Sequence, residues 1–239
     1  MRMVADLHVH TVASGHAYST VLELARAAAD RKLPMIALTD HGPAMPGGPH
    51  AYHFANQFCM PEEIFGVRVL KGIEANIINR DGELDLDEKR LAKLDIVLAG
   101  LHTFCAPYGT VEENTAMLVQ AIKNPWVDII VHPGNPEYPV DAETIVKAAT
   151  EYDVALEINN SSLTVSRCGS EAQCGEFARL AARYGAKLAV NSDSHFAASV
   201  GVLEEASALL EKSGIAAEAV LNTSLDAVWA HLKRRTNRR

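Results

Sequence analysis

The sequence predicts an α/β fold in which parallel strands, each followed by a helix, close into a barrel. Short apolar runs typical of buried strands alternate along the chain with amphipathic patterns typical of helices. His, Asp or Glu stands at the end of nearly every run. The 239 residues contain no internal repeat or linker, and barrels of this size commonly form one domain. We therefore expect a single domain over residues 1–239.

Seven strands are expected. They are the apolar runs at residues 4–8, 35–38, 67–73, 96–100, 127–131, 154–158 and 187–190. An open, doubly wound sheet is the alternative arrangement of such strands. That fold usually carries a Gly-rich phosphate loop after its first strand, whereas this chain continues into His8-Val9-His10. Polar residues spread over nearly all strand ends also favour the barrel.

Helices are expected between the strands and near the C-terminus. The first opens with a capping box, in which Thr20 is the N-cap and Glu23 reaches back, and it stops near Pro34. The others are expected at residues 87–94, 112–123, 141–152, 171–184, 200–212 and 225–233. The basic residues from 233 to 239 indicate a solvated helix end.

Two segments interrupt this alternation. Residues 42–60 are rich in Gly, Pro and His and lack a helical period, which indicates an active-site loop rather than a mere connector. Residues 76–87 surround Asp81-Gly82, a pair that favours tight primed turns. We expect them to form a β-hairpin insertion.

Composition excludes several classes of protein. A formal net charge of −8 argues against a nonspecific nucleic-acid or membrane surface. The start of the chain does not resemble a signal peptide, and no apolar run approaches the ~20 residues of a membrane span. Cys59, Cys105, Cys168 and Cys174 form no CxxC pair, so free thiols in a cytoplasmic protein are expected. A homo-oligomer is left open.

Nine potential metal ligands stand at or just after the expected strand ends. They are His8, His10, His16, His41, Glu74, His102, His132, Asp193 and His195. In α/β barrels these ends gather at one rim, so the nine side chains are expected to lie together. A single His is more often a hydrogen-bonded or surface residue, but this many imidazoles with two carboxylates would be hard to satisfy without cations. Only the sixth expected strand ends without a strong ligand type.

The number of ligands indicates the chemistry. One zinc ion takes about four ligands, so nine suit three divalent ions completed by solvent or substrate. Such a centre is strongly positive and fits an anionic substrate. A metal pair can deprotonate a bridging water and clamp a displacement at phosphorus, with Glu74 or Asp193 as the bridging carboxylate. The sequence therefore predicts a metal-dependent phosphoester hydrolase, in which a metal-bridging hydroxide attacks a small phosphorylated metabolite without a covalent phosphoenzyme.

The same residues resemble a known family. The motifs are His8-Val9-His10, Thr39-Asp40-His41, Gly72-Ile73-Glu74, His102, Val131-His132-Pro133 and Asn191-Ser192-Asp193-Ser194-His195. In this order they resemble the PHP family, named for polymerase and histidinol phosphatase, from residue 5 to about residue 230. Residues 131–136 and 156–162 are similar, more narrowly, to the YcdX-type bacterial phosphatases.

The resemblance implies a distorted (β/α)7 barrel with a trinuclear centre, usually of zinc, and imidazole ligands also leave manganese and iron open. It implies that one ion binds to His8, His10, Glu74 and Asp193. The second would bind to Glu74, His102 and His132, which makes Glu74 a bridge. The third would bind to His16, His41 and His195.

Other residues are candidates for substrate contacts. Arg167, after the sixth expected strand, could grip phosphate oxygens bidentately, with Ser166 and Asn160 nearby. A solvated loop arginine is the alternative. His50 and His53 could reach the site as acid or substrate contact, but surface positions are favoured.

Several alternatives remain. Asp6 shares a strand face with His8 and could either hold that imidazole or form a structural salt bridge. PHP proteins include 3′–5′ exonucleases, which the acidic balance disfavours. A metal-dependent amidohydrolase also begins with HxH on a barrel, but it would place a bridging lysine where this chain has Glu74. A non-catalytic metal-binding or regulatory protein would hold the same ligands.

Overall fold

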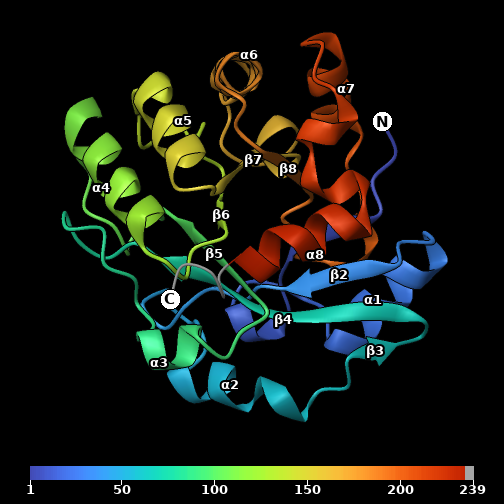
Figure 1. Ribbon diagram of the computed structural model, residues 1–239. Coiled ribbons are helices and arrows are strands. Elements are labelled where there is room, and N and C mark those ends of the chain that lie inside the picture. The colour runs from blue at the N-terminus through green and yellow to red at the C-terminus, as the bar shows by residue number, and fades with distance from the viewer. Residues whose placement is uncertain (235–239) are drawn as a thin grey trace.

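The computed structural model describes residues 1–234, and seven parallel strands form its barrel (Figure 1). In sheet order they are β1 (Ala5–Val9), β2 (Met35–Leu38), β4 (Val67–Asn76), β5 (Ile96–Gly100), β6 (Ile129–Ile130), β7 (Ala155–Asn159) and β8 (Leu188–Asn191). The last strand returns to the first, where the N–H of His10 donates to the carbonyl of Ser194 at 2.8 Å. A parallel bridge also joins Val9 to Ser194. The predicted single α/β barrel is thereby confirmed as a nearly closed ring.

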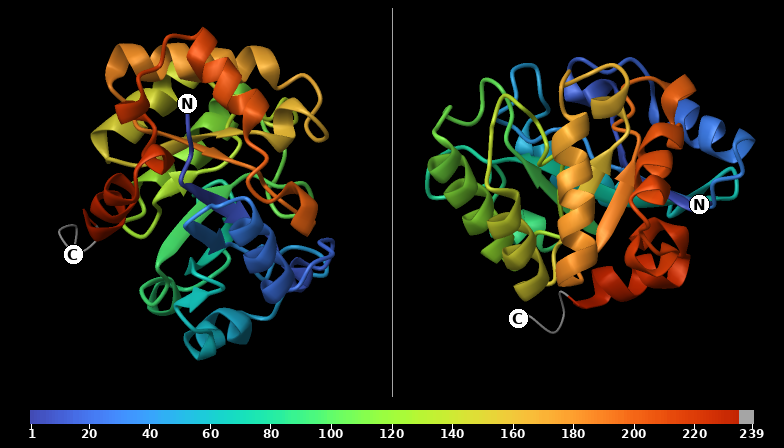
Figure 2. Two further views of the ribbon diagram at one scale, coloured as in Figure 1. Left: turned by 90° about the vertical axis from the view of Figure 1, so that its right-hand side faces the viewer. Right: turned by 90° about the horizontal axis from the view of Figure 1, so that it is seen from above.

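Helices surround the strands (Figure 2). They are α1 (Val21–Asp30), α2 (Ala51–Asn56), α3 (Glu88–Leu91), α4 (Val111–Lys123), α5 (Ala142–Glu151), α6 (Glu171–Tyr184), α7 (Glu204–Lys212) and α8 (Leu225–Lys233). The capping box of Thr20 and Glu23 forms at the start of α1 as predicted. Asp141 caps α5, and Gly185 ends α6 in the left-handed conformation that glycine adopts without strain.

The barrel has a separate apolar interior below its polar rim. All seven parallel strands contribute to one buried cluster, which includes Leu7, Leu70 and Ile129. Val228 and Leu232 of α8 join the same cluster. Helix α8 therefore seals the N-terminal end of the barrel, and the opposite end is left for polar side chains. A larger cluster lies between the strands and helices α4 to α7.

The prediction of a loop without helix over residues 42–60 was wrong. This segment contains α2 and a short 3₁₀ turn. His50 caps α2 by accepting from the N–H of Tyr52, and only Phe54 of the helix is buried. A helix of six residues with one buried side chain carries no periodic pattern, which is why the sequence did not reveal it. Met45 and Pro46 of this segment line the pocket described below.

Other boundaries also differ from expectation. A two-residue strand, β3 (Glu63–Ile64), pairs antiparallel with β4 and is too short to predict. Residues 76–87 reverse direction with a single antiparallel bridge between Ile77 and Leu84, rather than as a two-stranded hairpin. Helix α7 begins at Glu204 instead of residue 200, because Gly201 takes a φ of +71° that interrupts a helix. The end of the basic tail, residues 235–239, lies outside the described residues.

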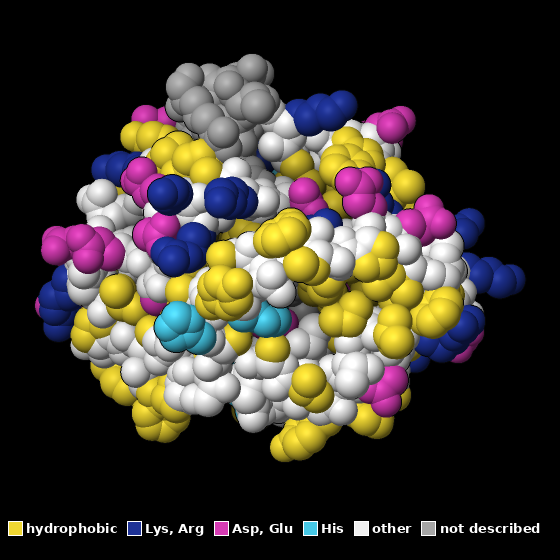
Figure 3. Space-filling model, turned by 90° about the horizontal axis from the view of Figure 1, so that it is seen from below, with side chains coloured by type: hydrophobic (Ala, Val, Ile, Leu, Met, Phe, Trp, Pro, Cys, Tyr) yellow, Lys and Arg dark blue, Asp and Glu magenta, His cyan; other side chains and the backbone are white. Residues whose placement is uncertain are grey.

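The surface carries mixed charge. On the face shown in Figure 3, Lys and Arg gather in the upper half and at the edges, and hydrophobic side chains are spread over the lower half. No helix within residues 1–234 is long and apolar enough to cross a membrane. The four cysteines are unpaired, as the sequence predicts.

Candidate metal centre

The C-terminal ends of the strands bring all nine predicted ligands together. His8 and Glu74 lie within β1 and β4, and the others follow strand ends. Glu74 is fully buried and stands at the centre of the cluster. Its Oε1 lies 2.8 Å from Nε2 of His132 and 2.9 Å from Nε2 of His102. Its Oε2 lies 2.7 Å from Nδ1 of His41.

A second carboxylate faces the first across the histidines of β1. Asp193 Oδ1 lies 3.2 Å from Nε2 of His10 and 3.5 Å from Nε2 of His8. The same two nitrogens lie 3.4 Å and 3.3 Å from the oxygens of Glu74. The two imidazoles therefore stand between two buried carboxylates.

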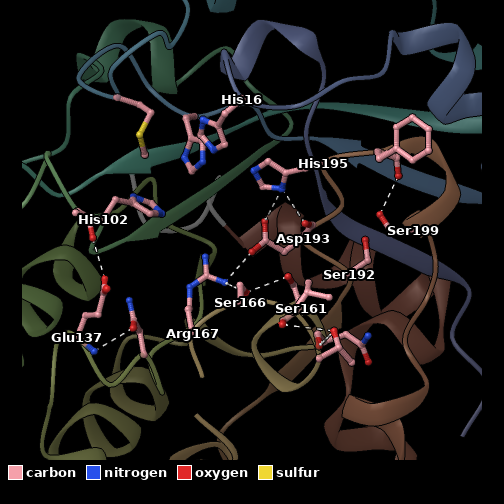
Figure 4. A pocket seen from close by; sticks show the side chains of 18 of the residues that line it. His16, His102, Glu137, Ser161, Ser166, Arg167, Ser192, Asp193, His195 and Ser199 are labelled. Atoms are coloured by element: carbon pink, nitrogen blue, oxygen red, sulfur yellow. Dashed lines mark hydrogen bonds and ion pairs between the residues drawn. The ribbon is translucent and has the colours of Figure 1, made fainter. Parts of the chain in front are cut away.

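The remaining histidines form the outer part of the cluster. The ring centroid of His16 lies 5.0 Å from the ring centroid of His41 and 4.9 Å from that of His195. In Figure 4, His16, His195 and His102 lie around one end of the pocket, and Arg167 projects toward Asp193. Three sets have all their potential ligand atoms within 4.8 Å of one another: His8 with His10 and Asp193, His10 with His41 and His195, and His41 with Glu74 and His102.

Hydrogen bonds fix which nitrogen of each inner imidazole faces the cluster. His8 Nδ1 lies 2.8 Å from a carboxylate oxygen of Glu157, which can only accept, so Nδ1 carries the proton. Ser14 Oγ donates to Asp40 and therefore accepts from Nδ1 of His10 at 2.9 Å. In both imidazoles Nδ1 is therefore held by a hydrogen bond and Nε2 is the nitrogen that faces the cluster, which is how a histidine that binds a metal ion is oriented.

The electrostatics of the cluster call for added positive charge. Burial opposes ionisation of Glu74, but the charges of His41, His102 and His8 hold its pKa well below the usual range. Burial opposes protonation of His8, yet the surrounding carboxylates, Glu74 first, raise its pKa well above the usual range. Burial lowers the pKa of His10 to about 3 and that of His132 to about 4, so both imidazoles are neutral at pH 7, as metal binding requires.

Unsatisfied atoms show that the residues fit bound cations. Buried atoms without a hydrogen-bond partner among residues 1–234 include Nε2 of His8 and Nε2 of His10. They also include Nδ1 of His41 and Oε2 of Glu74, which lie 2.7 Å apart but are not aligned for a hydrogen bond. Leaving this many buried polar atoms unpaired would cost several kcal/mol, roughly 1–3 kcal/mol for each. Imidazole nitrogen and carboxylate oxygen are ligands for Zn²⁺, Mn²⁺ and Fe²⁺. The donor set therefore suits divalent cations.

A pocket of about 1100 Å³ opens above this cluster. Its inner end is lined by His16, His41, His102, Asp193 and His195, and Arg167 enters from the side. The cluster can therefore be reached by a molecule much larger than phosphate.

Comparison with known proteins places the chain in a family. The model of the PHP domain matches residues 6–161, well over half of the chain. The chain belongs to the PHP domain family. This confirms the resemblance that the strand-end motifs predicted.

Relatives of this PHP chain match over its full length. A protein named probable phosphatase from Caldanaerobacter subterraneus subsp. tengcongensis is 52% identical over 239 residues, which cover all of this chain and 94% of the relative. Another protein named probable phosphatase, from Acetivibrio thermocellus, is 47% identical over 238 residues, with 100% and 98% of the two chains covered. A crystal structure of histidinol phosphate phosphatase from Lactococcus lactis, complexed with zinc, L-histidinol and phosphate, superimposes with a TM-score of 0.64. It is 15% identical, covers 90% of this chain and 95% of its own, and shows a shared fold.

Sequence reasoning missed one acidic residue of this PHP site. The sixth expected strand ends without a strong ligand type, but Glu157 lies within the corresponding strand β7 and is 1% exposed. Its carboxylate accepts from Nδ1 of His8 at 2.8 Å and from the N–H of His132 at 2.9 Å. The signal was available, since a lone Glu inside the apolar run of residues 154–158 must find buried partners.

Asp6 forms its hydrogen bonds with the loop after β8 and not with His8. Its carboxylate accepts from the N–H of Ser192 at 3.1 Å, from the hydroxyl of Ser192 and from the N–H of Gly201 at 2.8 Å. The pairing register of β1 shifts between Asp6 and Val9, so simple alternation along the strand does not apply there. Asp6 therefore anchors the loop after β8 instead of forming either of the expected interactions.

The three candidate phosphate contacts all line the pocket. Arg167 Nη1 lies 2.9 Å from Oδ2 of Asp193 and 3.0 Å from Oγ of Ser166, and its side chain is only 17% exposed. It is therefore held in place and is not the solvated loop arginine of the alternative. Asn160 uses its Oδ1 to accept from the N–H of Ala206.

The two histidines of the 42–60 segment lie away from the pocket lining. His50 is exposed and caps α2, which agrees with the favoured surface position. His53 is half-buried, and its Nε2 lies 3.3 Å from Oδ2 of Asp40. His53, Ser14 and Thr11 overcome the burial of Asp40 and lower its pKa to about 2. The segment thus contacts the carboxylate that orients His10 through Ser14.

Proposed function

We propose that this PHP-domain chain is a metal-dependent phosphatase that hydrolyses a small phosphorylated molecule, specifically a phosphomonoester. The observation that carries the proposal is the gathering of nine side chains with nitrogen or oxygen donors, Glu74 among them, at the inner end of a pocket that also holds Arg167. Several of their buried polar atoms have no hydrogen-bond partner within the described residues. The full-length relatives named probable phosphatase support the same activity.

We further propose that the cluster binds three divalent ions, zinc first and manganese or iron as alternatives. The first would bind to His8, His10, Glu74 and Asp193. The second would bind to Glu74, His102 and His132, and the third to His16, His41 and His195. Glu74 would be the bridging residue in this proposal, because Oε1 faces His102 and His132 of the second set and Oε2 lies 3.4 Å from Nε2 of His10 of the first set.

The chain's own residues would orient the phosphate. When bound, divalent ions act as Lewis acids and lower the pKa of water toward neutrality. The Arg167 guanidinium lies beside Asp193 and could turn its remaining N–H groups to two phosphate oxygens. Ser166 supports that guanidinium, and Asn160 lies on the same side of the pocket. Among the described lining residues there is no lysine, which disfavours the amidohydrolase alternative with its bridging lysine.

Elemental analysis combined with activity assays tests this function. Protein purified without added metal should contain close to three divalent ions per chain and should hydrolyse p-nitrophenyl phosphate. Chelation should lower the rate by at least 100-fold, and Zn²⁺, Mn²⁺ or Fe²⁺ should restore it. Full activity in the metal-free protein would refute the proposal. Faster turnover of single-stranded DNA than of p-nitrophenyl phosphate would favour the exonuclease, and full metal content with no turnover would favour a non-catalytic role.

A further inference from the structure

The outer wall of the pocket is unusually apolar and exposed. Phe104 is 84% exposed, Tyr18 76%, Phe196 56% and Val165 88%, and all four line the pocket. None of them belongs to the buried hydrophobic clusters. Large apolar side chains gathered around an opening mark a surface that binds an apolar group.

Phe104 is held in place at a conformational cost. Its φ is +72°, a left-handed conformation that is rare for a bulky residue and costs roughly 1–2 kcal/mol. It lies two residues after His102 in a loop that is well anchored. Tyr138 Oη lies 3.1 Å from the carbonyl oxygens of both His102 and Ala106, and the N–H groups of Cys105 and Ala106 donate to His102. The fold therefore presents the ring to solvent at the edge of the pocket, and strain of this kind is typical of functional sites.

The two ends of the pocket differ in character. Arg167, Asp193 and Glu137 are the charged lining residues within the described chain, and Asp193 lies at the histidine cluster. The carboxylate of Glu137 accepts a hydrogen bond from the hydroxyl of Thr103 at 2.8 Å. The hydroxyls of Thr164 and Ser199 donate to the carbonyls of Asn160 and Phe196. The outer wall thus offers aromatic faces, and a volume of about 1100 Å³ leaves ample space beyond a bound phosphate.

We propose that the substrates are phosphomonoesters whose alcohol carries a flat aromatic or heteroaromatic group, that Phe104 stacks against this group, and that Tyr18, Val165 and Phe196 complete the apolar wall. The inference rests on the proposed phosphatase function. In the reaction, the oxygen of water forms a new bond to phosphorus, the bond between phosphorus and the ester oxygen breaks, and the alcohol leaves with a proton from that water. The rings of Phe104 and Phe196 offer no hydrogen-bond partner to the hydroxyl groups of a sugar phosphate. Aromatic rings, by contrast, gain stacking energy there.

Matched substrates test the proposal. Propyl phosphate and 3-phenylpropyl phosphate leave as the same type of primary alkoxide, so their intrinsic reactivity is alike and only the distant ring differs. We expect kcat/KM to be at least 10-fold higher for 3-phenylpropyl phosphate than for propyl phosphate or glucose 6-phosphate. Phe104→Ala should lower kcat/KM for 3-phenylpropyl phosphate by about 5- to 30-fold, mainly by raising KM. The kcat/KM for propyl phosphate should change by less than twofold.

Two further variants separate binding from folding. Phe58→Ala removes a ring that is 75% exposed but lies outside the pocket lining, so it should leave both substrates unaffected. Phe104→Gly relieves the positive φ, so it should lose the same discrimination with a midpoint of thermal unfolding at or above that of the wild type. Equal turnover of all three esters would overturn this inference and leave the phosphatase intact. Turnover of none would contradict the phosphatase itself, and preference for single-stranded DNA would replace the small aromatic ester with a nucleic acid.

Discussion

Glu157 orients two of the proposed ligands with one carboxylate. One oxygen accepts from Nδ1 of His8 at 2.8 Å and from Asn191 at 2.9 Å, and the other accepts from the N–H of His132 at 2.9 Å. Burial opposes its ionisation, but the charge of His8 holds its pKa below the usual value. A carboxylate behind a ligating imidazole fixes the ring and increases its basicity. Glu157 is therefore a positioning residue for the proposed metal centre.

Replacing Glu157 by Gln tests this role. The glutamine amide has nearly the same shape, but its one oxygen cannot accept from both Nδ1 of His8 and the N–H of His132. His8 should therefore lose its fixed orientation. We expect metal affinity, measured by competition with a chelator, to fall by about 10- to 100-fold, and phosphatase activity at limiting metal to fall with it. Excess metal should restore most of the activity, which a merely unfolded protein could not show. Glu176→Gln is the control, because Glu176 is on the surface and pairs with Arg179. Unchanged metal retention in Glu157→Gln would contradict the role.

At the scale of the element, strand β5 ends at a glycine that makes room for two imidazoles. A Cβ at Gly100 would lie 2.7 Å from Cγ2 of Val131, 2.9 Å from Cε1 of His132 and 3.3 Å from Cε1 of His102. Real Cβ atoms do not approach other atoms so closely, so an added methyl group must displace a ring. The close approach of β5 and β6 therefore depends on the missing side chain.

Gly100→Ala should accordingly disturb the site. We expect a loss of about 1–3 kcal/mol in the free energy of unfolding and weaker metal binding, measured by denaturant unfolding and elemental analysis. Gly175→Ala provides the matched control, since no atom lies within 4 Å of its added Cβ in α6. That change should stabilise the protein by about 0.5–1 kcal/mol, because alanine favours a helix over glycine. Similar effects of the two substitutions would refute the steric argument.

The sequence predicted those elements that depend on local chemistry. The α1 capping box and the end of α6 at Gly185 follow from side chains that cap or terminate a helix. The seven parallel strands follow from short apolar runs. It did not predict α2 or β3, which are too short to have a period and exist because the rest of the fold packs against them. The gathering of the ligands was predictable from strand ends. The role of Glu157 was not predicted, because its partners lie 25 residues or more away in sequence except for Asn159.

On the scale of the whole molecule, the barrel has one reactive end and one sealed end. The rim at the C-terminal ends of the strands holds the histidine cluster, and α8 covers the opposite end with Val228 and Leu232. His231 of α8 is 2% exposed at the sealed end, and its Nε2 donates to the carbonyl of Asp128 at 3.0 Å. A titratable group here affects stability without touching the proposed metal centre.

His231 should make the protein less stable in mild acid. Burial and the charge of Arg234 lower its pKa to about 3 in the folded protein, against 6.5 for an unperturbed His. Below pH 6.5 the unfolded chain gains a proton that the folded chain does not take up until about pH 3, so the free energy of unfolding falls as pH falls through this range. At pH 5 the loss from this one group is about 2 kcal/mol. Urea unfolding of chelated protein measures the free energy of unfolding at pH 7.5 and pH 5. The fall between the two pH values should be smaller in His231→Gln than in the wild type by about 2 kcal/mol. The other histidines are common to both proteins and cancel in the difference, so an equal loss in wild type and variant would show that His231 does not set the acid sensitivity.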